Sequence, residues 1–140
     1  MAKADYDLKL NQLHEAGFFR SIEINRGIEK ESLRVNSLGY ISANDHPKSL
    51  GSPLTNPSIT TDFAESLVEL VTPTFTSVDD LYEHLLKLHI FVSRNLDKET
   101  LWPYSMPPKI EDEDSIKLAK YSNTNSGRIK EVYRRGLKER

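Results

Sequence analysis

The stretch RGIEKESLRV, residues 26–35, carries two carboxylates, Glu29 and Glu31, two residues apart in a pattern typical of a strand. A strand places residues i and i+2 on one face, about 6.5 Å apart, so both side chains would point the same way. Two like charges on one face repel each other unless water or a cation separates them. The pattern therefore leaves two interpretations open, a solvated outer face and half of a binding site for a divalent cation.

A second acidic stretch, ITTDFAESLVELVTPTF at residues 59–75, adds carboxylates at Asp62, Glu65 and Glu69. Its apolar residues fit either a helix or a strand, but the Thr-Pro pair favours extended backbone and predicts a strand over 66–72. In that strand, Glu65 and Glu69 would share a face. Adjacent antiparallel strands could bring both stretches to one magnesium site, although solvated glutamates are the commoner outcome of such a pattern.

The elements that must position these carboxylates include three predicted helices. Residues 5–16 form a short amphipathic candidate, and residues 78–95 form a stronger one with Ser77 as its N-cap. Residues 128–138 form a basic candidate that could bind phosphate or nucleic acid, although a solvated face is the favoured interpretation. The apolar stripe of the second helix consists of Leu81, Leu85, Leu88 and Val92.

Extended segments and loops account for the rest of the chain. Residues 18–35 alternate apolar and polar side chains and are predicted to be extended, and a turn signal at 36–39 predicts a hairpin. Prolines make loops of residues 45–58 and 101–115. The acidic run EDED, 111–114, is predicted to be a solvated part of the second loop.

Composition excludes several classes of function. The chain has 140 residues, which suits one domain, and its net charge of −2 gives no overall attraction to nucleic acid or anionic membranes. It has no cysteine, no signal-peptide core and no apolar run long enough to span a membrane, so we expect a cytoplasmic protein. There is no phosphate-binding loop or dinucleotide fingerprint. Metal-ligand spacing is lacking among the histidines, which are His14, His46, His84 and His89.

Several long motifs resemble one family in order and spacing. RGIEKESLRVNSLG, HPKSLGSPLTNPSITTDFAESLVELVTP, WPYSMP and YSNTNSGRIKEVYRRGLKER resemble the N-terminal part of proteobacterial-type glutamate–cysteine ligase, or γ-glutamylcysteine synthetase. The resemblance runs from about Gly27 to Arg140 and is loose over the first 20 or so residues. Family chains are several times longer, and the last predicted helix has no C-cap signal, so we expect residues 1–140 to be an N-terminal fragment of one catalytic domain.

The resemblance implies a fold and a reaction. The implied fold class is α+β, with a curved antiparallel sheet and packed helices, as part of a glutamine-synthetase-like catalytic fold. The implied reaction joins the γ-carboxylate of glutamate to cysteine through a γ-glutamyl phosphate, with ATP as a substrate and Mg²⁺ or Mn²⁺ as cofactor. This is the first step of glutathione biosynthesis. The implied partners are small molecules, with no nucleic acid and no membrane; the resemblance is compatible with a monomer and leaves oligomeric state open.

The resemblance also implies roles for individual residues. The implied metal ligands are Glu29, Glu31 and Glu69, with Asp62 as a further member. The implied cysteine pocket is lined by Phe63, Tyr133 and Leu137. Arg134 is the implied catalytic residue, in reach of a phosphate.

Two other classes of function stay open at this point. One is a non-catalytic fragment or binding module that binds another chain, including the rest of a ligase. The other is a nucleic-acid binder that uses the basic predicted helix at 128–138, against which the overall acidity argues. We expect the 140 residues alone to have no ligase activity, because the remaining metal ligands and most ATP and glutamate contacts of the family lie outside them.

Overall fold

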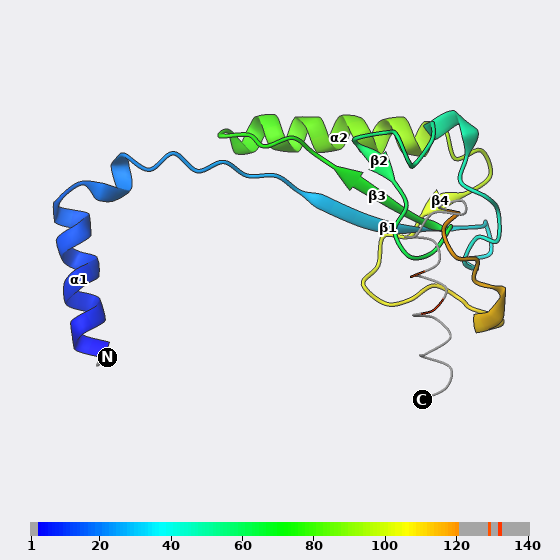
Figure 1. The fold of residues 1–140 in the computed structure, drawn as a ribbon, viewed down its shortest axis with the longest axis horizontal. Helices are drawn as coiled ribbons and strands as arrows, with labels where there is room; N and C mark the ends of the chain where they lie inside the picture. Colours follow the sequence, from blue (N-terminus) through cyan, green and yellow to red (C-terminus); the bar gives the residue numbers. More distant parts are fainter. Residues whose placement is uncertain (1–2, 121–128, 130–131, 133–140) are drawn as a thin grey trace.

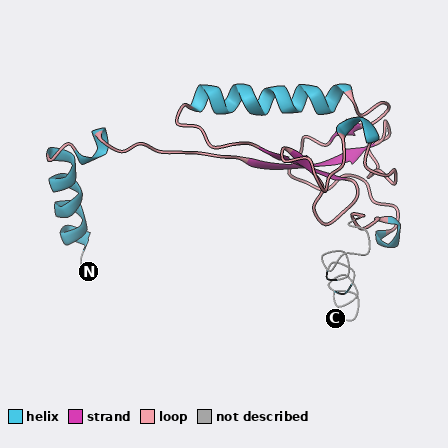
Figure 2. Cartoon of the chain, turned by 45° about the horizontal axis from the view of Figure 1, so that its top comes forward, coloured by secondary structure: helices cyan, strands magenta, loops and turns pink. Residues whose placement is uncertain are grey.

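A computed structural model of the chain describes residues 3–120, 129 and 132. The strands in this described part form one sheet in the order β2-β3-β1-β4, and every strand pairing is antiparallel (Figures 1 and 2). Their bounds are Glu29–Val35 for β1, Ile59–Thr60 for β2, Leu67–Val71 for β3 and Thr100–Leu101 for β4.

The central strands β1 and β3 confirm the two strands predicted at 26–35 and 66–72. Their register pairs Glu31 with Glu69 and Ser32 with Val68. Val68 and Leu70 are almost completely buried, so the alternation of β3 sends every second residue into the core. A slip of one residue would move Glu69 into that core, so burial of the apolar positions fixes the register.

Helix α2, Val78–Arg94, confirms the helix predicted at 78–95 and lies along one side of the sheet (Figure 1). It begins at the predicted N-cap, because the Ser77 hydroxyl accepts a hydrogen bond from Asp80 N at 3.2 Å. Its apolar stripe packs against one face of the sheet. The buried core consists of Leu50, Ile59, Val68, Leu70, Val92 and Leu96.

Helix α1, Lys3–Glu15, agrees with the helix predicted at 5–16. It lies apart from the sheet at the end of an extended arm (Figure 1). Its apolar residues are exposed, so the apolar side of this helix is not buried against the described part of the chain. The prediction that 18–35 is extended throughout was wrong at its start, where Phe18–Arg20 form one turn of 3-10 helix. Gly17 has φ of 70° and turns the chain there, a conformation that glycine adopts without strain.

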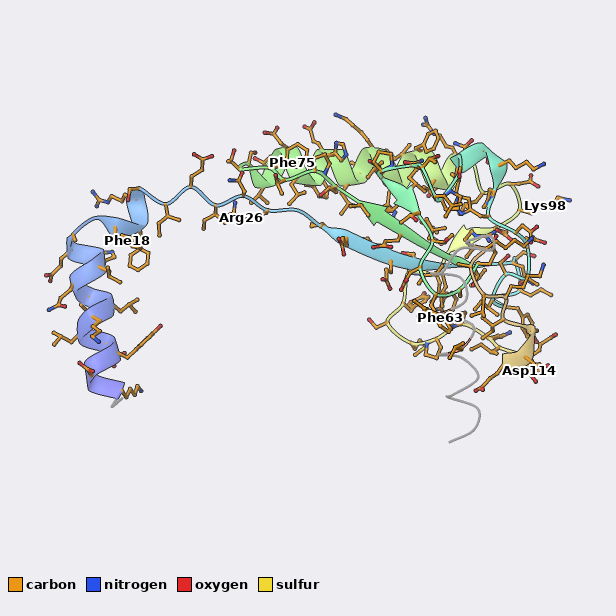
Figure 3. The ribbon with its side chains drawn as sticks, in the orientation of Figure 1. Phe18, Arg26, Phe63, Phe75, Lys98 and Asp114 are labelled. Carbon is orange, nitrogen blue, oxygen red and sulfur yellow. The ribbon has the colours of Figure 1, made fainter. Side chains whose placement is uncertain are left out.

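The arm joins the body where Arg26 and Phe75, both labelled in Figure 3, exchange backbone hydrogen bonds of 2.9 and 2.8 Å. The predicted hairpin at 36–39 is confirmed, since Asn36 N donates to Tyr40 O at 2.9 Å. The acidic run 111–114 is exposed, as predicted.

Two further predictions concern the helix at 128–138 and membrane-spanning segments. The helix predicted at 128–138 lies outside the described residues, apart from Ile129 and Val132, which are helical. No helix in the described part of the chain has the length and apolar character needed to cross a membrane.

Candidate active site on the acidic face of the sheet

Three glutamates share the face of the sheet that points away from α2, which we call the acidic face. Glu31 and Glu69 are direct cross-strand partners, and Glu29 lies two residues before Glu31 on β1. Cross-strand partners point to the same side of a sheet, as do residues i and i+2 of one strand. Glu29 and Glu31 are exposed, and Glu69 is half-buried. The predicted sharing of a face by these residues is therefore confirmed.

The spacing of the acidic face suits hard cations, although the ligand set is incomplete. Direct cross-strand Cβ atoms lie about 4.5–5.5 Å apart, a separation over which two carboxylates can face one cation. Within residues 3–120, 129 and 132, no three His, Asp or Glu side chains form a group that could hold a metal ion. Carboxylate oxygens are ligands that Mg²⁺ and Mn²⁺ prefer, but the described residues form no such group, so the assignment of these glutamates as ligands stays a prediction.

The other predicted site residues lie near this face or outside the described chain. Asp62 and Phe63 are half-buried in the loop between β2 and β3. Figure 3 shows Phe63 on the side of the sheet away from α2. Tyr133, Arg134 and Leu137 lie outside the described residues, so their predicted roles stay predictions.

Glu65 departs from the position that the sequence pattern predicted for it. It lies in the turn before β3, not on the strand beside Glu69, and only 4% of the residue is exposed. Its Oε1 accepts a hydrogen bond from His46 N at 2.9 Å, and its Oε2 accepts one from Lys120 N at 2.8 Å. The prediction of a shared face was wrong because two backbone N–H groups, and not the strand alternation, decide where this carboxylate lies.

Arg34 is a second buried charge that the sequence analysis missed. Its side chain is fully buried and forms an ion pair with Glu99, whose side chain is 8% exposed. Its Nη2 donates to the backbone oxygens of Asn44 and Glu65, each at 2.9 Å. The available signal was an arginine two residues after Ser32 on one strand. Both side chains lie on the same face of β1, and both are buried.

The segment before Lys120 runs beside the loop that holds Phe63. Ala119 N donates to Phe63 O at 3.0 Å, and Glu65 N donates to Lys117 O at 2.9 Å. Exposed Asp45 forms ion pairs with Lys117 and Lys120, and its hydrogen bond with Lys120 is the main cause of the lowered pKa of its carboxyl group.

His46 lies at the edge of a cavity of about 410 Å³ next to Glu65. Both ring nitrogens are enclosed and have no hydrogen-bond partner. Burial lowers the pKa of His46, the charge of Arg34 lowers it further, and the charge of Glu65 opposes the shift. Burial and the charge of Arg34 therefore favour the neutral imidazole over its protonated form.

The comparisons with known proteins cover this whole region. The family model described as glutamate-cysteine ligase matches residues 10–140. A glutamate–cysteine ligase of Hahella chejuensis is 53% identical over 116 residues, which are 82% of this chain and 22% of that relative. One of Yersinia pseudotuberculosis is 50% identical over 117 residues, 84% of this chain and 22% of the relative. The chain thus spans about a fifth of the length of these curated relatives.

Solved structures show the same fold. The crystal structure of a glutamate–cysteine ligase from Francisella tularensis in complex with AMP has a TM-score of 0.73 and 42% identity, over 83% of this chain and 23% of that one. A bifunctional glutathione synthetase from Pasteurella multocida has a TM-score of 0.71 and 36% identity, over 77% of this chain and 15% of its own. The α+β class, with an antiparallel sheet and packed helix as part of a glutamine-synthetase-like fold, is confirmed. The fold, the acidic face and the family match over 10–140 agree, and the chain belongs to the glutamate–cysteine ligase family.

Proposed function

We propose that this chain supplies the acidic face of a glutamate–cysteine ligase, which joins glutamate to cysteine at the expense of ATP. The observation that carries the proposal is the pairing of Glu31 with Glu69 across β1 and β3, on the face away from α2, in a chain whose family match spans residues 10–140. Cations bound between these charges would relieve their mutual repulsion, and this is the role that we propose for the acidic face.

The proposed reaction has two steps. The γ-carboxylate of glutamate attacks the γ-phosphorus of ATP, so an oxygen–phosphorus bond forms and the bond to ADP breaks. The amine nitrogen of cysteine then attacks the carbonyl carbon of the γ-glutamyl phosphate. The new amide bond forms as inorganic phosphate leaves, and the amine proton passes to solvent or a base.

The residues of the acidic face would act on the phosphoryl groups through bound cations. A bound Mg²⁺ or Mn²⁺ would neutralise the charge on the transferring phosphoryl group. The residues proposed to hold it are Glu29, Glu31, Glu69 and Asp62. Carboxylates suit this task because hard cations prefer oxygen ligands and often bridge to substrate phosphates.

The acceptor amino acid would bind beside this face. Phe63 would form part of an apolar wall for cysteine, together with Tyr133 and Leu137, and Arg134 would contact a phosphate. The proposed partners are small molecules only, glutamate, cysteine and ATP, with neither nucleic acid nor membrane. We place the reaction in the cytoplasm.

The test uses a chimera in which residues 10–140 replace the matching part of the Hahella chejuensis ligase. We expect this chimera to release phosphate and form γ-glutamylcysteine only when Mg²⁺, ATP, glutamate and cysteine are all present. Glu31→Gln in the chimera should lower kcat by about a hundredfold or more, the range seen when one charge-stabilising group is removed. Glu83→Gln, on the exposed side of α2, is the matched control and should leave kcat unchanged.

Two results would contradict the proposal. A folded chimera that turns over no substrate, under conditions in which the Hahella chejuensis ligase is active, would support a non-catalytic module. Glu31→Gln with the turnover of Glu83→Gln at saturating Mg²⁺ would remove the acidic face from the reaction. The 140 residues alone should give no turnover, because aligning three substrates contributes up to about 7–11 kcal/mol that a partial site forfeits.

A further inference from the structure

Glu65 is a buried carboxylate to which the proposed chemistry gives no role. Its side chain joins three segments that are distant in sequence. The donor His46 N lies 19 residues before Glu65, and the donor Lys120 N lies 55 residues after it. Each donates to a different oxygen, at 2.9 and 2.8 Å. The carboxylate therefore fixes the loop at 45–58 and the segment that ends at Lys120 relative to the turn before β3.

The backbone around Glu65 strengthens the same junction. Its N–H donates to Lys117 O at 2.9 Å, and its carbonyl oxygen accepts from the buried Arg34 Nη2 at 2.9 Å. Phe63, two residues earlier, accepts a hydrogen bond from Ala119 N at 3.0 Å through its own carbonyl. The position of Phe63 thus depends on the segment that the Glu65 carboxylate holds in place.

The two backbone N–H donors explain why residue 65 is a glutamate and not a glutamine. Burying a carboxylate is costly unless hydrogen bonds compensate it, and these two bonds use one oxygen each. Glutamine offers one carbonyl oxygen and one NH₂ group, so one of the two backbone donors would face another donor. A side chain of this length needs a second acceptor oxygen to satisfy both segments, and only glutamate has it.

We propose that Glu65 is a positioning residue for the cysteine subsite. By holding the segment before Lys120 against Phe63, its carboxylate sets the shape of the apolar wall that receives the acceptor amino acid. The inference rests on the proposed function, in which Phe63 lines that subsite. Glu65 belongs neither to the acidic face nor to the residues proposed to line the cysteine subsite, so we expect it to act on the affinity for cysteine and not on phosphoryl transfer.

The kinetic test uses Glu65→Gln in the chimera described above. We expect the KM for cysteine to rise about tenfold, the factor that matches the loss of one hydrogen bond to a charged group. The KM for ATP and kcat should change by less than about twofold, because the acidic face is untouched. Glu65→Asp keeps both oxygens and should give a smaller rise in the KM for cysteine. Glu83→Gln should change none of these constants.

A second measurement, amide hydrogen exchange of the 140-residue chain, tests the junction around Glu65 without requiring ligase activity. In Glu65→Gln, the amides of His46 and Lys120 should exchange with deuterium faster than in the parent chain, because one or both lose their acceptor. The amide of Val68, in the core strand β3, should keep its protection. This pattern would report a local loosening of the junction in a chain that remains folded.

The two measurements separate failure of this inference from failure of the proposed function. An unchanged KM for cysteine in an active chimera would overturn it. An equal rise in the KM for ATP, or lost protection at Val68, would also overturn it, because Glu65 would then serve folding alone. A parent chimera without ligase activity would refute the proposed function and, with it, the cysteine assignment, while the exchange rates would still decide whether Glu65 holds the two segments.

Discussion

Removing the carboxylate of Glu99 should destabilise the chain far more than breaking an exposed ion pair. Arg34 has a fully buried side chain, and Glu99 is its only carboxylate partner among the described residues. Glu99→Ala would leave a buried guanidinium whose Nε has no partner even in the parent chain. It would also leave Ser42 Oγ and Asn44 Nδ2 without their shared acceptor.

The magnitude follows from that burial. Breaking a buried pair by deleting one partner costs about 3–5 kcal/mol, because the remaining charge is uncompensated. Total stabilities of domains are about 5–15 kcal/mol, so this change removes a large part of the free energy of unfolding. The exposed Glu83–Lys87 pair on α2 is the control, and Glu83→Ala should cost about 0.3–0.5 kcal/mol.

Urea denaturation of the 140-residue chain, followed by far-ultraviolet circular dichroism, measures both free energies. The double change Arg34→Met with Glu99→Leu should recover part of the loss, because an apolar pair of similar size needs no charge compensation, although the backbone oxygens of Asn44 and Glu65 lose their Arg34 donor. A cost for Glu99→Ala no larger than that for Glu83→Ala would refute the reasoning. So would a double variant less stable than Glu99→Ala, since the cost would then not come from an unpaired charge.

Three further changes test the fold by the same urea measurement. The pKa of His46 is lowered in the folded chain, whereas in the unfolded chain it has the ordinary value of 6.5. The unfolded chain therefore takes up the proton first as the pH drops, so the free energy of unfolding should fall below about pH 6.5. His46→Gln should flatten this pH dependence, and an unchanged slope would contradict it. Leu70→Ala in the core should cost about 2–5 kcal/mol. Gly51→Ala should cost about 1–3 kcal/mol, because φ of 84° with ψ of −174° suits glycine alone, whereas Gly27→Ala should be nearly neutral.

The sequence predicted the acidic face because strand alternation is a local rule. Val68 and Leu70 had to enter a core, and the period of two then sent Glu69 to the other side. The same rule placed Glu29 and Glu31 together on β1. The pairing of β1 with β3 was not predictable in this way, because β1 places Lys30 and Ser32, and not apolar residues, beside Leu70 and Val68 on the side that faces α2.

Glu65 and Arg34 could not be predicted in the same way, because long-range partners decide their positions. The donors to Glu65 come from His46 and Lys120, in loops with no period of their own. The partner of Arg34, Glu99, lies 65 residues away, in the connection between α2 and β4. A charged residue among apolar neighbours signals a buried network, but its sequence position does not name the partner.

The binding of Mn²⁺ to the 140-residue chain, read by paramagnetic broadening of backbone amide signals, tests the central claim most directly. The account predicts that substoichiometric Mn²⁺ broadens the amides of Glu29, Glu31 and Glu69 first, and that added Mg²⁺ reverses the broadening. The exposed acidic run 111–114 is the built-in competitor, and Figure 3 shows Asp114 apart from the central strands. Broadening that begins at 111–114 and spares β1 and β3 would contradict the assignment of the acidic face as the cation site.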